Sequence, residues 1–121
     1  MKLVIEEPES SALEDYVPRE ALLAISRIAI VEVPRATALA NPSDEVRRET
    51  ARLLQACLLV AVTDRVLRNA AAISSREVRT LAAIHLSTAL YVEADELIAY
   101  DRRLLAAAQA QGVAVAAPGL D

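Results

Sequence analysis

The sequence of 121 residues has one cysteine, one histidine, two glycines and three tyrosines, and it has neither tryptophan nor phenylalanine. A single cysteine excludes an internal disulfide framework, and with only one histidine beside it a zinc site of soft ligands is unsupported. Cys57 lies in an apolar run, so we expect a buried, unreactive thiol. The shortage of aromatic rings argues against recognition of nucleic acid bases by stacking. Any metal site would have to use carboxylates.

Long apolar runs and an excess of basic residues are also missing. Although 55% of the residues are hydrophobic, no uninterrupted stretch is long enough to cross a bilayer. The short run after Lys2 is followed at once by acidic residues, unlike a signal peptide, so we expect a cytoplasmic protein without a membrane partner. The net charge of −4 argues against broad adhesion to nucleic acid but allows a local basic rim. The length predicts one domain over residues 1–121.

Apolar segments of strand length alternate with helical segments along most of the chain. We expect strands at 21–25, 58–62, 97–100 and 113–116, and helices at 9–17, 27–39, 43–57, 63–72, 81–92 and 102–111. Ser43 and Thr80 are the expected N-caps of two helices, Gly112 is an expected C′ residue, and Pro34 predicts a late start near residue 31 or a kink. This order indicates an α/β fold with a parallel sheet covered by helices on both faces.

Two carboxylates fall where such a sheet would bind ligands, beyond the carboxyl ends of its strands. Asp101 follows an expected strand, and Glu32 lies on the helix after another. Two carboxylates about 4 Å apart repel by about 4 kcal/mol at an effective dielectric near 20, and Mg²⁺ held by oxygen ligands would relieve this repulsion. Taken alone, two of 17 acidic residues are equally explained as surface residues.

A family resemblance favours the functional interpretation. Residues 30–36, 79–89 and 99–104, in this order and followed by 112–118, resemble a PIN domain, and more narrowly the VapC toxins of VapBC toxin–antitoxin pairs. The resemblance implies a PIN-like parallel sheet and a Mg²⁺- or Mn²⁺-dependent endoribonuclease. It also implies an RNA substrate, a homodimer and silencing by a VapB-type antitoxin.

The resemblance also implies which residues form the site. Glu32 and Asp101 match acidic positions of the family and would be catalytic metal ligands. Ala82 occupies a position that is normally acidic, and Ala99 one that is often threonine. With two carboxylates we expect weak Mg²⁺ binding and little or no cleavage.

The first residues allow two interpretations. Residues 2–7 resemble the end of a family helix stopped at Pro8, in which case the first acid lies upstream of Met1 and the fold lacks its first, central strand through an N-terminal truncation. Alternatively, residues 2–5 are the first strand and Glu6 is a substitute acid. We prefer the first interpretation, because Pro8 follows too soon for the usual passage from strand to helix.

Basic residues and the histidine complete the candidate set. His85 lies on one helical stripe with Leu81 and Thr88, which favours a packed, hydrogen-bonded histidine over a general base. Arg35 could pair with Glu32 or touch RNA phosphate. The remaining arginines that flank the matched motifs, and are expected to form a phosphate-facing rim, are Arg79, Arg102 and Arg103.

The sequence therefore predicts a VapC-like endoribonuclease toxin that is catalytically impaired. The alternative is a non-catalytic PIN-like module that binds an antitoxin or forms dimers. A third interpretation is an α/β domain that binds a small molecule without metal. Restoring an acid at Ala82 would distinguish the first two.

Overall fold

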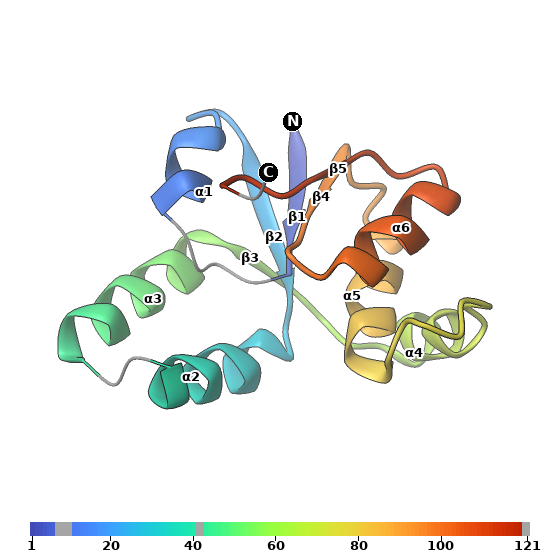
Figure 1. Cartoon of the computed structure of the whole chain (residues 1–121), viewed down its shortest axis with the longest axis horizontal. Coiled ribbons are helices and arrows are strands. Elements are labelled where there is room, and N and C mark those ends of the chain that lie inside the picture. Colours follow the sequence, from blue (N-terminus) through green and yellow to red (C-terminus); the bar gives the residue numbers. More distant parts are fainter. Residues whose placement is uncertain (7–10, 41–42, 120–121) are drawn as a thin grey trace.

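The computed structural model describes residues 1–6, 11–40 and 43–119 and shows a five-stranded parallel sheet between two layers of helices (Figure 1). The strand order is β3-β2-β1-β4-β5, and every pairing is parallel. The strands are β1 (Lys2–Ile5), β2 (Leu22–Ser26), β3 (Leu58–Val60), β4 (Glu96–Ile98) and β5 (Val115–Ala116). The helices are α1 (Ser11–Tyr16), α2 (Ala29–Ala40), α3 (Asp44–Ala56), α4 (Asp64–Ala71), α5 (Thr80–Tyr91) and α6 (Arg102–Ala110).

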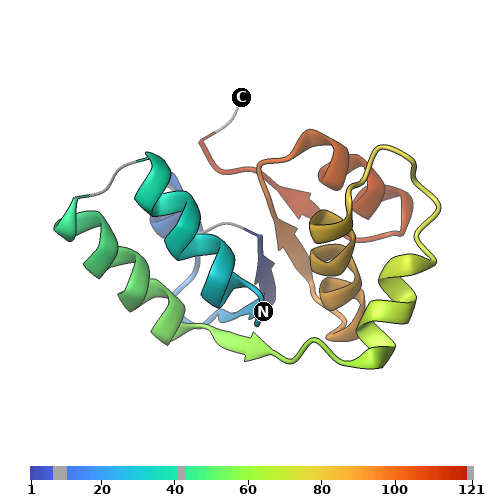
Figure 2. The ribbon, with the colours of Figure 1, turned by 90° about the horizontal axis from the view of Figure 1, so that it is seen from below.

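Helices α1, α2 and α3 lie on one face of the sheet, and α4, α5 and α6 lie on the other (Figures 1 and 2). Alternate residues of β1 supply the two cores, as the period of a strand requires. Val4 packs with Leu86 of α5 and Leu104 of α6, whereas Leu3 and Ile5 pack with residues that include Leu13 of α1. The predicted α/β fold with both faces covered is confirmed.

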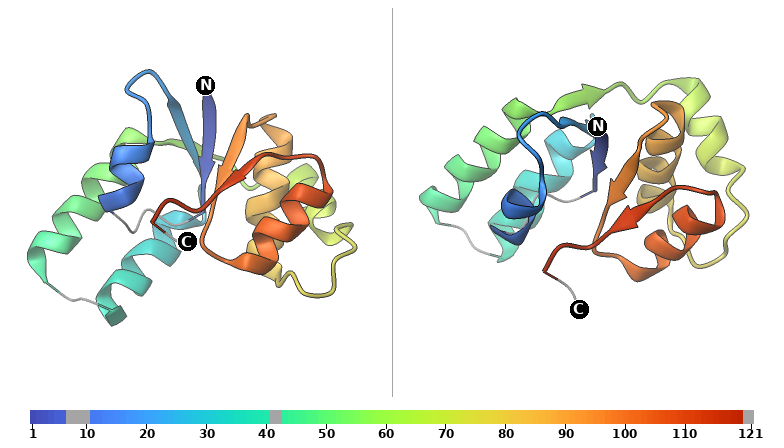
Figure 3. Two further views of the ribbon diagram at one scale, coloured as in Figure 1. Left: turned by 45° about the horizontal axis from the view of Figure 1, so that its top comes forward. Right: turned by 90° about the horizontal axis from the view of Figure 1, so that it is seen from above.

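The expected helix over residues 2–7 is wrong, because Lys2–Ile5 is the central strand of the sheet (Figure 3). It pairs with β2 on one side and β4 on the other, and Leu3, Val4 and Ile5 are fully buried. A fully apolar run buries more of its side chains as a central strand, which is covered on both faces, than as the end of a helix. The inference of a missing first strand rested on that helix and is not tested by the structure. Residues 7–10, which carry the expected turn at Pro8, lie outside the described residues.

Several helix ends agree with the sequence, and two do not. Ser43 caps α3 by accepting a hydrogen bond from the Val46 amide at 3.2 Å, and Gly112 follows α6 with φ 83°. The N-cap of α5 is Arg79 rather than Thr80, which is already helical. Helix α2 begins at Ala29 and continues through Pro34, so the late start near residue 31 is also wrong.

Within the described part of the chain, no helix combines the length and apolarity that a membrane span needs.

Candidate active site

Glu6, directly after β1, is the central acidic residue of the carboxyl edge of the sheet. Its backbone amide donates a hydrogen bond of 2.9 Å to the carbonyl oxygen of Ile98 in β4. This hydrogen bond extends the pairing of β1 and β4 to the ends of both strands. Asp101 lies shortly after the end of β4. The structure thus gives Glu6 the position that the second interpretation of the N-terminus predicted.

The surroundings of Glu6 show which charged groups gather at this edge. Burial is the main cause that raises the pKa of the Glu6 carboxyl above its ordinary value of 4.5. His85 opposes the rise, Asp101 adds to it, a hydrogen bond with the Tyr100 backbone opposes it, and Glu32 adds to it. Side chains from four separate segments therefore lie close enough to influence one protonation equilibrium.

Glu32 is held from the opposite helical layer by His85. Nε2 of the histidine lies 2.7 Å from Oε1 of the carboxylate, and the two side chains are 3% and 31% exposed. This contact joins α5 to α2 at the carboxyl edge of the sheet. The prediction of a packed, hydrogen-bonded histidine is confirmed. Within the described residues Glu32 therefore pairs with His85, while the alternative partner, Arg35, is exposed.

Asp101 is exposed and acts as the N-cap of α6. Its Oδ1 accepts a hydrogen bond from the Arg103 amide at 2.9 Å. A carboxylate at a helix N-terminus is stabilised by the unpaired amides and by the helix dipole. This hydrogen bond anchors the Asp101 side chain next to the edge that carries Glu6.

Ala82 lies in the first turn of α5 and is only 8% exposed. It belongs to the core cluster that includes Val4, Ala24 and Leu86. The position that the resemblance identifies as normally acidic is therefore filled here by a packed methyl group, which supplies no oxygen ligand.

Among the described residues, no group of three or more His, Cys, Asp and Glu side chains is arranged to hold a metal ion. The donor chemistry at the edge nevertheless suits a hard cation, because Glu6, Glu32 and Asp101 all offer carboxylate oxygens. His85 contacts one oxygen of Glu32, and the Arg103 amide contacts one oxygen of Asp101. Three residues thus fit the ligand type of Mg²⁺ without forming a closed ligand set.

The predicted basic rim is exposed and is associated with the same segments. Arg102 and Arg103 occupy the first turn of α6, directly after Asp101, and Arg79 precedes α5. Arg35 lies one turn after Glu32 on α2. Arg79, Arg102 and Arg103 therefore lie at the N-termini of α5 and α6. Backbone amides and arginine side chains at such positions both favour the binding of an anion.

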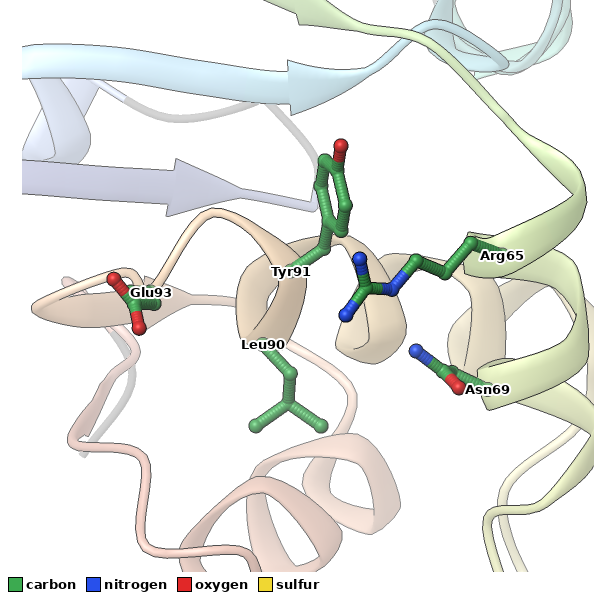
Figure 4. Close-up of a pocket in the computed structure, with 5 residues that line it drawn as sticks. All are labelled: Arg65, Asn69, Leu90, Tyr91 and Glu93. Carbon is green, nitrogen blue, oxygen red and sulfur yellow. The ribbon is translucent and has the colours of Figure 1, made fainter.

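A depression of about 270 Å³ lies at the other end of α5 (Figure 4). The Arg65 guanidinium lies 5.9 Å from the ring centroid of Tyr91. Tyr91 follows Ala82 by nine positions, which corresponds to about 14 Å along a helix. The remaining lining residues are Asn69, Leu90 and Glu93. This depression is distinct from the acidic edge.

The prediction for Cys57 needs a small correction. The thiol is half-buried rather than fully buried, and it lies at the carboxyl end of α3. Burial raises the pKa of the Cys57 thiol, so the nucleophilic thiolate is disfavoured. An unreactive cysteine remains the interpretation that fits.

Sequence reasoning placed Glu6 second and did not identify the partner of His85. The available signal for Glu6 was the apolar run that precedes it, because the other candidate acid Asp101 also follows an apolar strand. The contact between Glu32 and His85 spans 53 residues, and no local pattern reveals it.

Comparison with known proteins places the chain in a family. No protein-family model matches the chain. Ribonuclease VapC46 of Mycobacterium tuberculosis (strain ATCC 25618 / H37Rv) is 40% identical over 120 residues, which cover 98% of this chain and 91% of that protein. Ribonuclease VapC35 of the same strain is 36% identical and Ribonuclease VapC47 of strain CDC 1551 / Oshkosh 30% identical, each over 124 residues that cover 98% of this chain. These proteins are 91% and 90% covered, respectively. The chain therefore belongs to the VapC family of PIN-domain toxins.

Proposed function

We propose that this chain is a VapC-type endoribonuclease that depends on Mg²⁺ or Mn²⁺ and acts at the carboxyl edge of its sheet. The observation that carries the proposal is the convergence of Glu6, the hydrogen-bonded pair Glu32–His85 and Asp101 at this edge, where they influence the pKa of the Glu6 carboxyl. Converging carboxylates with a buried member need a proton or a cation between them. At this edge a divalent cation would supply an activated water and neutralise charge at phosphorus.

Each residue of the edge has a role in this proposal. Glu32 and Asp101 are the metal ligands, direct or through water, and Glu6 is a third carboxylate that takes the part of the first family acid. Arg102 and Arg103 bind the RNA phosphates that flank the cleaved bond, and Arg79 and Arg35 extend this rim. The exposure of all four arginines agrees with such a role.

The activity of this chain is low in our proposal, because Ala82 removes one acidic ligand. Oxygens of Glu32 and Asp101 are also engaged, by His85 and by the Arg103 amide. A cation must therefore bind with fewer anionic ligands than in a complete site, so its affinity is weak.

The proposed partners follow from the family. A VapB-type antitoxin silences the chain, which works in the cytoplasm as a homodimer on cellular RNA. Exposed apolar side chains on α2, namely Ile30, Val31 and Leu39, are 45%, 62% and 85% exposed. Apolar residues on one helix are the kind of surface against which a partner helix packs.

The alternative function is a non-catalytic PIN-like module that binds the antitoxin or forms dimers. It is favoured by the burial of Ala82 in the core and by the internal contacts of Glu32 and Asp101. A module of this kind would use the fold without needing a cation.

The test compares Mn²⁺-dependent cleavage of a mixed RNA by the parent chain and by Ala82→Asp, with a chelator control. Ala83→Asp is the matched control, because Ala83 is 9% exposed and packs in a different cluster. We expect activity to increase in Ala82→Asp and not in Ala83→Asp, and Glu32→Gln to abolish the gain. If the parent and Ala82→Asp proteins are both folded and neither cleaves RNA, the result would contradict the proposed nuclease activity and favour the non-catalytic module.

A further inference from the structure

His85 is a buried polar residue whose part in the site is not explained by the proposed ligands. The residue is 2% exposed, yet its Nε2 contacts Oε1 of Glu32 on the opposite helical layer. The other ring nitrogen, Nδ1, is buried and has no hydrogen-bond partner among residues 1–6, 11–40 and 43–119. The one described side-chain hydrogen bond of the imidazole therefore joins it to a single carboxylate oxygen.

This geometry favours one arrangement of the ring proton. A carboxylate oxygen accepts, so the bond requires a proton on Nε2. Nδ1 has no described partner that could accept a proton. The contact with Glu32 therefore assigns the donor role to Nε2.

We propose that His85 is the positioning residue for Glu32. Its Nε2–H holds Oε1 and thereby orients the carboxylate toward Glu6 and Asp101, leaving the second oxygen to face a cation. A glutamate side chain that is 31% exposed would otherwise sample several rotamers, and ordering it costs free energy. The electrostatic influence of Glu32 on Glu6 agrees with this orientation. The inference rests on the proposed function of the edge.

The opposite role for His85 makes a distinguishable prediction. If the imidazole instead withheld Glu32 from the cation, removal of the Nε2 donor would tighten metal binding. If it positions Glu32, removal of the donor weakens metal binding by about 10- to 100-fold, the usual effect of losing a group that orients a ligand. The direction of the change thus separates positioning from competition.

The experiment measures Mn²⁺ affinity of the full chain by electron paramagnetic resonance of the free ion. It uses the parent and the Ala82→Asp background, each with His85→Gln and His85→Asn. A glutamine amide reaches the place of Nε2, whereas an asparagine amide reaches only that of Nδ1. We expect His85→Gln to retain most of the affinity and His85→Asn to lose it. An affinity in folded His85→Asn that equals or exceeds the starting protein would overturn the positioning role.

A second measurement observes the His85 ring directly and does not depend on how the His85 variants fold. His85 is the only histidine, so the ring nitrogens of an untagged, labelled chain are identified in an NMR spectrum without assignment. We expect a proton on Nε2, and faster solvent exchange of that proton in Glu32→Ala. A ring protonated only on Nδ1 would overturn the proposal.

The two proposals fail in different ways. Mn²⁺ binding that is the same with and without the Nε2 donor removes the role of His85 and leaves the nuclease site intact. No Mn²⁺ binding in either the parent or Ala82→Asp removes both.

Discussion

The backbone amide of Glu6 hydrogen-bonds to the carbonyl oxygen of Ile98 at 2.9 Å, and this contact fixes the first acidic residue at the centre of the sheet edge. The acid follows a strand whose three apolar residues, Leu3 to Ile5, are all fully buried. Burial is also the main cause that raises the pKa of the Glu6 carboxyl.

Glu6→Gln should change how stability depends on pH. Burial raises the pKa of the Glu6 carboxyl in the folded protein above its ordinary value of 4.5, with Asp101 and Glu32 adding to the rise. The folded state then holds this proton more tightly than the unfolded state, so the contribution of Glu6 to stability falls as pH rises from 4.5 through the folded pKa. We expect the variant to lose this decline and to be more stable than the parent at neutral pH.

Urea unfolding at a series of pH values from 4.5 upward measures the effect. Glu49→Gln, an exposed change on α3, is the control and should keep the slope of the parent. A parallel pH dependence of the parent and Glu6→Gln would contradict the electrostatic description of the edge.

Glu93→Gly should stabilise the chain by about 1 kcal/mol. Glu93 has φ 53°, a left-handed backbone conformation that is unfavourable for residues with a β-carbon but not for glycine. The residue closes α5: its amide donates to Leu90, and the amide of Ala94 donates to Ala89, as in a Schellman motif. Thermal or urea unfolding measures the gain. Glu93→Ala, which keeps a β-carbon, should gain much less, and equal gains in both would point to the charge instead.

Thr63→Ala should destabilise the chain by about 1 kcal/mol, the usual cost of losing an N-cap. The Thr63 hydroxyl accepts a hydrogen bond from the Val66 amide at 3.2 Å at the start of α4. The chemical denaturation midpoint reports the loss. Thr63→Ser retains the acceptor and should remain close to the parent, so a similar loss in both variants would exclude capping as the cause.

Arg102→Ala and Arg103→Ala should each weaken RNA binding and lower the salt dependence of log K by about 1. The capping of α6 should survive, because Asp101 uses the backbone amide of Arg103 rather than its side chain. Fluorescence anisotropy with a single-stranded RNA, at several salt concentrations, measures the slope. Arg47→Ala on α3, whose side chain lies 3.9 Å from Asp44, is the matched control and should leave the slope unchanged.

The sequence predicted those features whose causes are local. Ser43 and Gly112 were identified because a cap and a left-handed turn depend on a few neighbouring residues. The acidic edge was predicted through Asp101 and Glu32 because the carboxyl ends of parallel strands meet. Arg79 was missed as the cap of α5, since it makes no side-chain hydrogen bond there and leaves no chemical signal.

The features that were missed depend on residues far apart in the chain. Residues 2–5 suit either a strand or a helix end, and only pairing with β4, as in Leu3 with Glu96, decides between them. Likewise, nothing near His85 indicates Glu32. Glu6 as the central acid follows from the first of these long-range contacts.

The position of β1 also has a consequence for the order in which the molecule can fold. Strand β1 precedes β4 in the chain, and the hydrogen bond from the Lys2 amide to the side chain of Asp95, just before β4, spans 93 residues. Closing so long a loop slows folding. Until this loop closes, β2 covers only one of the two edges of β1, and the other edge stays open to pairing with another chain.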